Sequence, residues 1–216
     1  MPGKQMNQML KVATAALAVL VMAGSVDLAH ANCAKVRPSK PGEVYFMRGL
    51  ANIFSLGLDE FSKEVTSLGV ENCVYNHAFW EAVVNDIVER SYQKQISYPI
   101  IIVGHSLGAN IAPLMATRIG KHSIPVRYVA MLDPVDPTVV GANVVEIVNY
   151  YLPHRKDNIL RPNASFTGQL ENVNVKQFGG FDHFNIDEKR NLRNKMKQRI
   201  VEVIDEELQM DSTVAQ

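Results

Sequence analysis

The stretch Ile100–Asn110 reads IIIVGHSLGAN and constrains the fold more than any other part of the chain. Its four leading apolar residues favour a buried strand, and the residues after the serine have the apolar spacing of a helix. Gly104 stands two residues before Ser106, and Gly108 stands two residues after it. A strand that turns sharply into a helix needs small residues there, because the helix passes close to the strand. The stretch therefore predicts a strand–turn–helix unit with Ser106 at its tip.

The rest of the sequence alternates short apolar runs with longer amphipathic ones. This alternation is typical of a parallel sheet that is covered by helices. We expect an α/β domain over residues 32–216, with a mostly parallel sheet of about six strands and helices on both faces. The expected strands are Glu43–Met47, Val70–Tyr75, Tyr98–Val103, Val126–Leu132, Val144–Tyr151 and Asn172–Gln177. The expected helices are Phe54–Leu68, Ala78–Lys94, Leu107–Gly120 and Asp187–Glu207.

The connections between these elements leave little room for a lid. Residues 133–143 are too few for a cap domain. Residues 152–170 are polar and contain proline, which favours a loop over one edge of the sheet. This loop could fold over the turn at Ser106 as a small lid. We expect Asp187 to be the N-cap of the last helix, because aspartate side chains accept bonds from free N–H groups there.

The composition is that of an ordinary globular protein, and it argues against several function classes. Of 216 residues, 47% are hydrophobic and 20% charged, with 22 basic against 22 acidic residues. This balance gives no electrostatic reason to expect nucleic acid or an anionic membrane as a partner. The histidines lack the spacing of metal ligands, and the chain has no G-x-x-x-x-G-K phosphate loop. We therefore expect no metal and no cofactor.

The first 31 residues have the pattern of a signal peptide. Lys4 and Lys11 precede the uncharged apolar stretch Val12–Gly24, and Ala29-His30-Ala31 then provides a small-x-small cleavage site. A membrane anchor is the alternative, but the apolar stretch falls short of the roughly 20 residues that span a bilayer. We expect residues 1–31 to be cleaved, leaving no membrane span, and the protein to be periplasmic or secreted.

Export gives the two cysteines a structural meaning, because disulfides persist in oxidising compartments. Cys33 and Cys73 are the only pair available, so we expect a disulfide that ties the start of the exported chain to a strand. Two free thiols are one alternative. A lipid-anchored Cys33 is another, although Asn32 before it is larger than such a cleavage signal normally permits.

A serine at a strand–helix turn becomes a nucleophile when a base and a set of N–H donors lie within reach. The motif GHSLG in this context resembles the α/β-hydrolase superfamily, and the resemblance extends over nearly all of residues 32–216. By its size the chain is similar to the small lidless members: small secreted lipases, cutinase-like esterases and thioesterase-like hydrolases.

The resemblance implies a fixed chain order of nucleophile, acid and histidine. Ser106 comes first, and His183 in GGFDHFNID lies between the last expected strand and the last helix, where the superfamily keeps its base. Asp133 directly follows the strand after the serine strand and is our first candidate for the acid. Asp157, after the next strand, is the second candidate, and Asp136 is the third.

The resemblance also implies an oxyanion hole made of two backbone N–H groups. One belongs to Leu107, directly after the serine, and the other to Leu50, in the loop after the first strand. Lipases that the chain resembles often carry His-Gly in this loop, whereas this chain has Arg48-Gly49. We expect Arg48 to pair with a loop acid or with a substrate carboxylate.

These residues predict a serine hydrolase that cleaves small carboxylic esters or thioesters through an acyl-enzyme. The alternative is an exported protein of the same fold that binds a lipid or a protein partner without turnover, because fold alone does not prove chemistry. The sequence leaves the oligomeric state open.

Overall fold

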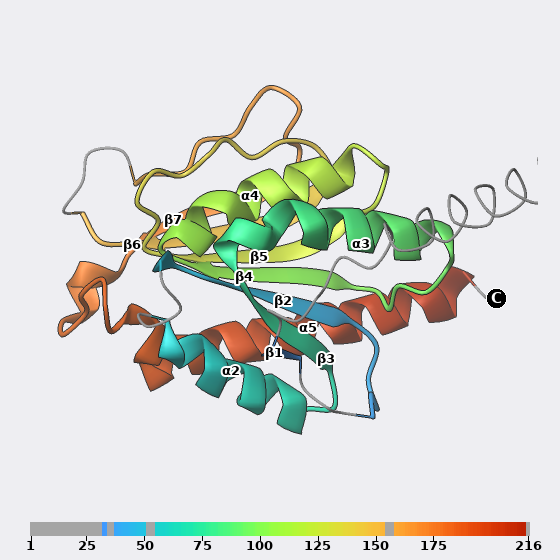
Figure 1. Ribbon diagram of the computed structural model, residues 1–216, viewed down its shortest axis with the longest axis horizontal. Helices are drawn as coiled ribbons and strands as arrows, with labels where there is room; N and C mark the ends of the chain where they lie inside the picture. Colours follow the sequence, from blue (N-terminus) through green and yellow to red (C-terminus); the bar gives the residue numbers. More distant parts are fainter. Residues whose placement is uncertain (1–31, 34–36, 51–54, 154–157, 215–216) are drawn as a thin grey trace, which may run out of the picture. The chain divides into compact units, whose positions relative to one another are not determined.

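A computed structural model describes residues 32–33, 37–50, 55–153 and 158–214, and the strands in these ranges form one sheet. The strand order is β1-β3-β2-β4-β5-β6-β7 (Figure 1). All neighbouring strands are parallel except the pair β1 and β3. The strands are β1 Asn32–Cys33, β2 Glu43–Arg48, β3 Glu71–Asn76, β4 Ile100–His105, β5 Val126–Leu132, β6 Val144–Tyr151 and β7 Gln169–Asn174.

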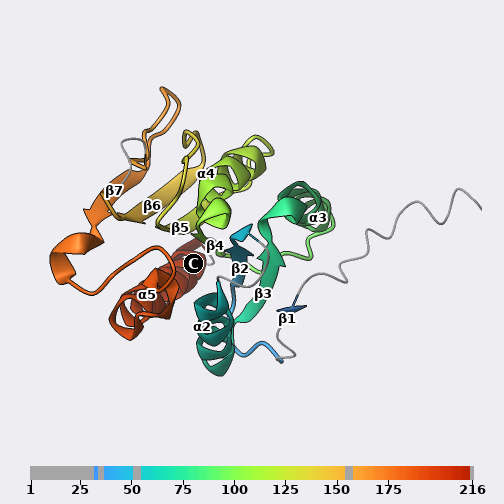
Figure 2. The same ribbon diagram turned by 60° about the vertical axis from the view of Figure 1, so that its left-hand side comes forward.

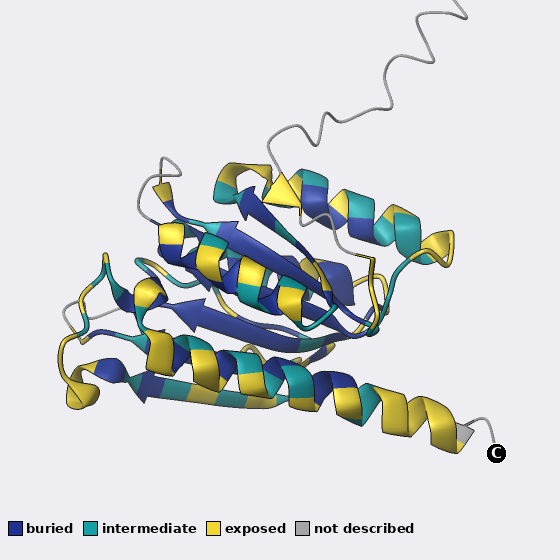
Figure 3. Ribbon diagram, turned by 90° about the horizontal axis from the view of Figure 1, so that it is seen from below, coloured by how far each residue is buried: buried dark blue, intermediate teal, exposed yellow. Residues whose placement is uncertain are grey.

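Helices cover both faces of this sheet (Figures 1 and 2). Helices α3 (Trp80–Tyr92) and α4 (Leu107–Gly120) pack on one face, and α2 (Leu56–Ser67) and α5 (Arg190–Val214) on the other. Each face has its own cluster of buried apolar side chains, and the helices turn their buried sides to the sheet (Figure 3). The α/β class with helices on both faces is therefore confirmed.

The sheet has seven strands rather than about six. The additional strand, β1, has only two residues, so no run of apolar side chains announces it. The disulfide between Cys33 and Cys73 joins it to β3, where the two cysteines face each other in the antiparallel register. The cross-link lets so short a segment pair with the sheet.

Most element boundaries lie within a few residues of those expected, and the shifts of two strands have a physical reason. Strand β4 begins at Ile100 rather than Tyr98, since Pro99 has no N–H to donate to a neighbouring strand. Strand β7 is Gln169–Asn174 rather than Asn172–Gln177, and the short 3₁₀ helix η4 follows it. This last strand lies at the sheet edge and is largely polar, so its apolar pattern is too weak to fix its limits.

The last helix begins at Arg190, so the expectation that Asp187 is its N-cap is wrong. Asp187 lies in the 3₁₀ helix η5 (Ile186–Glu188) and is buried against the first turn of α2. A Cβ atom on Gly57 would stand 2.4 Å from the Asp187 carbonyl carbon, so the two segments touch through their backbones. The contact between η5 and α2 thus removes Asp187 from the start of the helix that follows.

The parallel strands bring the expected site residues to one edge of the sheet. Strands β2, β4 and β5 are adjacent and end at Arg48, His105 and Leu132. Loops that leave the carboxyl ends of parallel strands meet there, which is where α/β proteins bind their ligands. The expected signal peptide, residues 1–31, lies outside the described residues. Among the helices that are described, none is both long and apolar enough to cross a membrane.

Candidate active site

Ser106 occupies a strained turn between β4 and α4. Its φ of 57° and ψ of −119° are values that side-chain-bearing residues rarely adopt. A Cβ atom on Gly104 would stand 2.3 Å from the Gly108 carbonyl oxygen, and one on Gly108 would stand 1.9 Å from the Met47 carbonyl oxygen. Both glycines are therefore required by the close approach of strand, turn and helix, and the turn projects Ser106 at the sheet edge.

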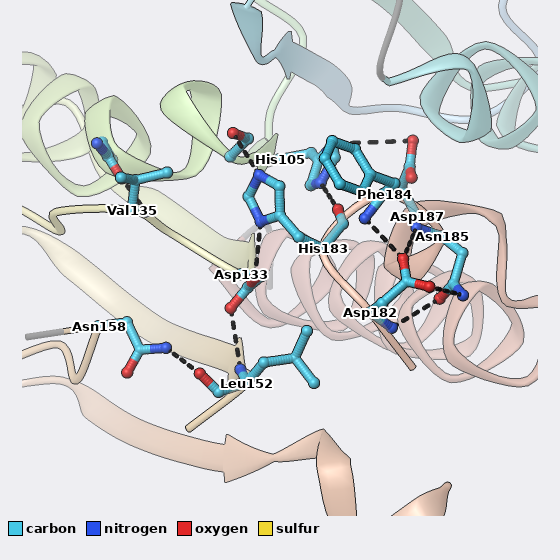
Figure 4. Close-up of polar contacts among 12 residues, drawn as sticks. His105, Asp133, Val135, Leu152, Asn158, Asp182, His183, Phe184, Asn185 and Asp187 are labelled. Carbon is cyan, nitrogen blue, oxygen red and sulfur yellow. Dashed lines mark hydrogen bonds and ion pairs between the residues drawn. The ribbon is translucent and has the colours of Figure 1, made fainter. Parts of the chain in front are cut away.

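Ser106, His183 and Asp133 form a continuous chain of hydrogen bonds. The Ser106 Oγ lies 3.0 Å from His183 Nε2, and His183 Nδ1 lies 2.7 Å from Asp133 Oδ2 (Figure 4). With the carboxylate oxygen as acceptor, Nδ1 carries the proton and donates, and Nε2 accepts from the serine hydroxyl. The three side chains come from three separate segments, and the fold brings them together in the order expected for a catalytic triad.

Asp133 is fixed in place by its surroundings. Its side chain is fully buried, and its Oδ1 accepts a 2.9 Å hydrogen bond from the Leu152 N–H, at the end of β6. Its φ of 43° turns the chain sharply after β5. The carboxylate is thus aimed at His183 by the backbone of two neighbouring strands.

The other two acid candidates stand differently. Asp136 is exposed, and its backbone N–H donates to Asn110 Oδ1 at 3.0 Å, which ties its loop to α4 rather than to His183. Asp157 lies outside the described residues. Of the candidates in the described ranges, Asp133 is the one that contacts the histidine.

The loop expected to hold the oxyanion lies against the serine. A Cβ atom on Gly49 would stand 2.8 Å from Ser106 Cβ and 3.3 Å from its Oγ. Leu50 follows Gly49 and is largely exposed, while Leu107 begins α4 directly after the serine. Arg48 forms an ion pair with Asp59 in the first turn of α2. Its guanidinium is thus paired with a carboxylate of the protein.

A second polar chain lies beneath the serine and was missed by the sequence. His105 is fully buried; its Nδ1 lies 2.9 Å from Ser55 Oγ and its Nε2 lies 2.8 Å from the His183 carbonyl oxygen. The carbonyl only accepts, so Nε2 carries the proton, and Nδ1 accepts from the Ser55 hydroxyl. Burial lowers the pKa of His105 to about 4, which keeps the ring neutral in this role.

Asp187 completes this buried region. Its Oδ2 lies 3.9 Å from His105 Nδ1, beyond hydrogen-bonding distance. Burial raises the pKa of its carboxyl to about 7, although the backbone N–H groups of Gly57 and Leu58 partly oppose the rise. The sequence holds no local signal for this arrangement, because it depends on how η5 meets the start of α2.

An apolar cavity of about 360 Å³ opens beside His183. Its volume is in the range of small-molecule sites, which are mostly apolar with a few polar groups. Lys176 and Asp182 supply charged groups at this cavity. Its lining consists of Leu152, Pro153, Lys176, Phe181, Asp182, His183 and Phe184.

A match to a protein-family model shows the family of the chain. The profile of the family described as lipase (class 3) matches residues 19–140. The chain belongs to the class 3 lipase family. The matched part of this lipase family member includes Ser106 and Asp133 but ends before His183, so the histidine rests on the geometry above. No curated protein sequence matches the chain.

One solved structure shares the fold of this class 3 lipase family member over most of its length, and two others align with about half of it. The thioesterase domain SrfTE, which cyclises the lipopeptide antibiotic surfactin, aligns with a TM-score of 0.56 at 12% identity, over 82% of this chain and 96% of that domain. Est1E from Butyrivibrio proteoclasticus aligns with a TM-score of 0.38 at 16% identity, over 48% of this chain and 45% of Est1E. A thioesterase domain from the curacin biosynthetic pathway aligns with a TM-score of 0.33 at 18% identity, over 48% of this chain and 41% of that domain. The chain thus spans less than half of Est1E and of the curacin domain.

Proposed function

We propose that the protein is a serine hydrolase that cleaves carboxylic ester or thioester bonds through an acyl-enzyme. The observation that carries the proposal is the hydrogen-bonded chain from Ser106 through His183 to Asp133. The class 3 lipase family supports the ester side of this proposal. The fold likeness to the surfactin thioesterase domain motivates a test of thioesters.

The reaction follows from the position of each group. The Ser106 oxygen attacks the substrate carbonyl carbon while its proton passes to His183 Nε2, and Asp133 stabilises the imidazolium that results. The N–H groups of Leu107 and Leu50 hold the oxyanion of the tetrahedral intermediate. The carbon–oxygen or carbon–sulfur bond then breaks, and the leaving alcohol or thiol takes the proton from His183. Water then gives a proton to His183 and attacks the acyl carbonyl carbon. The bond to Ser106 breaks, the carboxylic acid leaves, and Ser106 takes its proton back from His183.

The surroundings of the site favour soluble substrates of short or medium chain length. The cavity beside His183 can bury an apolar group of limited size. The described part of the 152–170 loop is held beside Val140: the Asn163 N–H donates to the Val140 carbonyl at 2.9 Å, and Leu160 is buried in the core on the α4 side of the sheet. These contacts support an open groove at Ser106 rather than a lid that moves at a lipid surface.

The disulfide supports a further part of the proposal, that residues 1–31 direct export and the protein acts outside the cytoplasm. Cys33 and Cys73 are bonded to each other, and disulfides of this kind persist in oxidising compartments. Edman sequencing of the protein recovered from its exporting host should begin at Asn32. A chain that still begins at Met1 would contradict the cleavage.

The test of the function is a chain-length series of p-nitrophenyl esters and acyl-thioesters, with Ser106→Ala as the control. We expect turnover of short and medium chains that rises smoothly through the solubility limit of the substrate. Equal rates for the wild type and Ser106→Ala would contradict the proposal. A rate that jumps when micelles form would contradict the open groove alone.

A further inference from the structure

His77 contacts the loop that the proposed mechanism uses for its oxyanion hole. Its Nδ1 lies 3.1 Å from the Gly49 carbonyl oxygen. The carbonyl only accepts, so the imidazole donates from Nδ1. His77 is half-buried, opens the 3₁₀ helix η3 (His77–Phe79) directly after β3, and belongs to neither of the two polar chains described above.

The strand order places His77 and Ser106 on opposite sides of this loop. Strand β2 lies between β3 and β4, with Arg48 opposite Asn76 on one side and Met47 opposite Gly104 on the other. The chain that continues from β2 through Gly49 therefore passes between the residue after β3 and the residue after β4.

The geometry of the peptide bond after Gly49 sets the direction of the Leu50 N–H. The bond between Gly49 and Leu50 is trans, and in a planar trans peptide the C=O and the following N–H point in opposite directions. Because the Gly49 carbonyl is directed at His77, the Leu50 N–H points away from His77, to the side where β4 ends at the serine. In the proposed mechanism a donor on that side can hold the oxyanion.

We propose that His77 is a positioning residue of the oxyanion hole: its Nδ1–H holds the Gly49 carbonyl and so keeps the Leu50 N–H directed at the carbonyl oxygen that Ser106 attacks. This inference rests on the proposed serine hydrolase function. It concerns the orientation of one peptide, which the triad alone does not fix.

Gly49 explains why such a restraint is needed. Glycine rotates freely about its backbone bonds, so a peptide that follows it can flip at little cost. The Gly49 N–H is already held, since it donates to the buried Ser55 Oγ at 3.0 Å, and the hydrogen bond from His77 restrains the peptide on the carbonyl side. Without His77 the carbonyl can turn to the serine, where its partial negative charge would repel the oxyanion.

The experiment compares two substitutions at this position in the full chain. His77→Phe keeps a ring but removes the donor, whereas the Nδ2 of His77→Asn can take the place of the imidazole Nδ1 and donate. We expect His77→Phe to lower kcat by about 10- to 100-fold with KM within about twofold of wild type, less than the loss of a whole oxyanion donor. His77→Asn should recover most of the rate. The affinity for a trifluoromethyl ketone, which forms a tetrahedral adduct, should fall in step with kcat/KM.

A second readout does not depend on turnover. The ¹⁵N spectrum of the wild-type histidines, at a pH where imidazole is neutral, should show His77 protonated at Nδ1. Protonation at Nε2, or a hydrolase whose kcat/KM is the same in wild type and His77→Phe, would overturn the inference. Equal losses in His77→Phe and His77→Asn would also overturn it. A wild-type protein that turns over no ester or thioester would instead overturn the proposed function, and the role of His77 with it.

Discussion

Two histidine–aspartate pairs lie next to each other at the end of β4, and they differ in geometry and burial. The rings of His183 and His105 are 5.3 Å apart. In the outer pair, His183 Nδ1 lies 2.7 Å from Asp133 Oδ2, and the histidine side chain is 23% exposed. In the inner pair, His105 Nδ1 lies 3.9 Å from Asp187 Oδ2, and both side chains are 1% exposed. The outer pair is hydrogen-bonded and its histidine is partly exposed to solvent, whereas the inner pair is too far apart for a hydrogen bond and is buried.

The difference is the reason why the proposed mechanism gives the proton transfer to His183 rather than to His105. In the inner pair, both nitrogens of His105 are occupied, one by the Ser55 hydroxyl and one by the His183 carbonyl. Burial also lowers the pKa of His105 to about 4 and raises that of Asp187 to about 7, so the inner pair resists becoming an ion pair. His183 keeps Nε2 for the serine. In the proposed mechanism the same two residue types thus give a base in one place and a buried support for the turn in the other.

The largest expected effects come from removing Ser106 or the histidine of the outer pair. Ser106→Ala and His183→Ala should each lower kcat by at least about 10⁴-fold, and the double variant should be hardly worse than either, because the two residues act as one unit. Steady-state kinetics with the best ester of the series measures this. Losses that simply multiply in the double variant would show that the residues do not share a mechanism.

The two aspartates provide the next test, because the same isosteric change can be made in both pairs. Asp133→Asn should lower kcat by about 10³- to 10⁴-fold, since an amide no longer selects the histidine tautomer that accepts the serine proton. Asp187→Asn should change kcat by less than about threefold, because Asp187 touches no group that reacts. Comparable losses in both variants would break the distinction between the pairs.

A smaller effect on activity, but a clear one on stability, is expected at His105. His105→Ala removes one hydrogen bond from the Ser55 hydroxyl and one from the His183 carbonyl, and it opens a cavity; together these changes should lower the free energy of unfolding by about 2–4 kcal/mol. Denaturant unfolding measures this, and kcat should fall by about tenfold as His183 loses its backbone contact. His122→Ala, at an exposed histidine, is the control and should stay within about 0.5 kcal/mol of wild type. A His105→Ala protein as stable as this control would contradict the supporting role of His105.

The pH dependence of stability distinguishes the members of the inner pair. Native Asp187 keeps its proton up to about pH 7, whereas an unfolded aspartate loses it near 3.8, so the native state binds more protons in that window and stability falls as pH rises. Native His105 binds fewer protons than the unfolded chain between about pH 4 and 6.5, so its contribution rises with pH and opposes that of Asp187. In Asp187→Asn only the contribution of His105 to this pH dependence remains. We therefore expect the melting temperature of the variant to rise more between pH 4 and 6.5 than that of wild type. A smaller gain would contradict the buried, protonated Asp187.

The sequence predicts the outer pair because local and topological rules determine it. Gly104 and Gly108 mark the turn, and the end of the next parallel strand brings Asp133 beside it. His183 is predicted from the chain order of the superfamily that the sequence resembles. The inner pair has no such signal: Asp187 has the local pattern of a helix N-cap, and only the contact between η5 and α2 buries it near His105. The limits of β7 were missed for a related reason, because an edge strand that is largely polar carries little periodicity.

The rate at which a fluorophosphonate labels Ser106 tests the central claim most directly, because phosphonylation needs an activated serine but no particular substrate. Peptide mapping by mass spectrometry follows the Ser106 adduct over time in wild type, Asp133→Asn and Asp187→Asn. We predict rapid labelling in wild type and Asp187→Asn, and labelling slower by at least about 100-fold in Asp133→Asn. Rapid labelling in Asp133→Asn together with slow labelling in Asp187→Asn would show that the buried pair activates the serine, and would contradict the account.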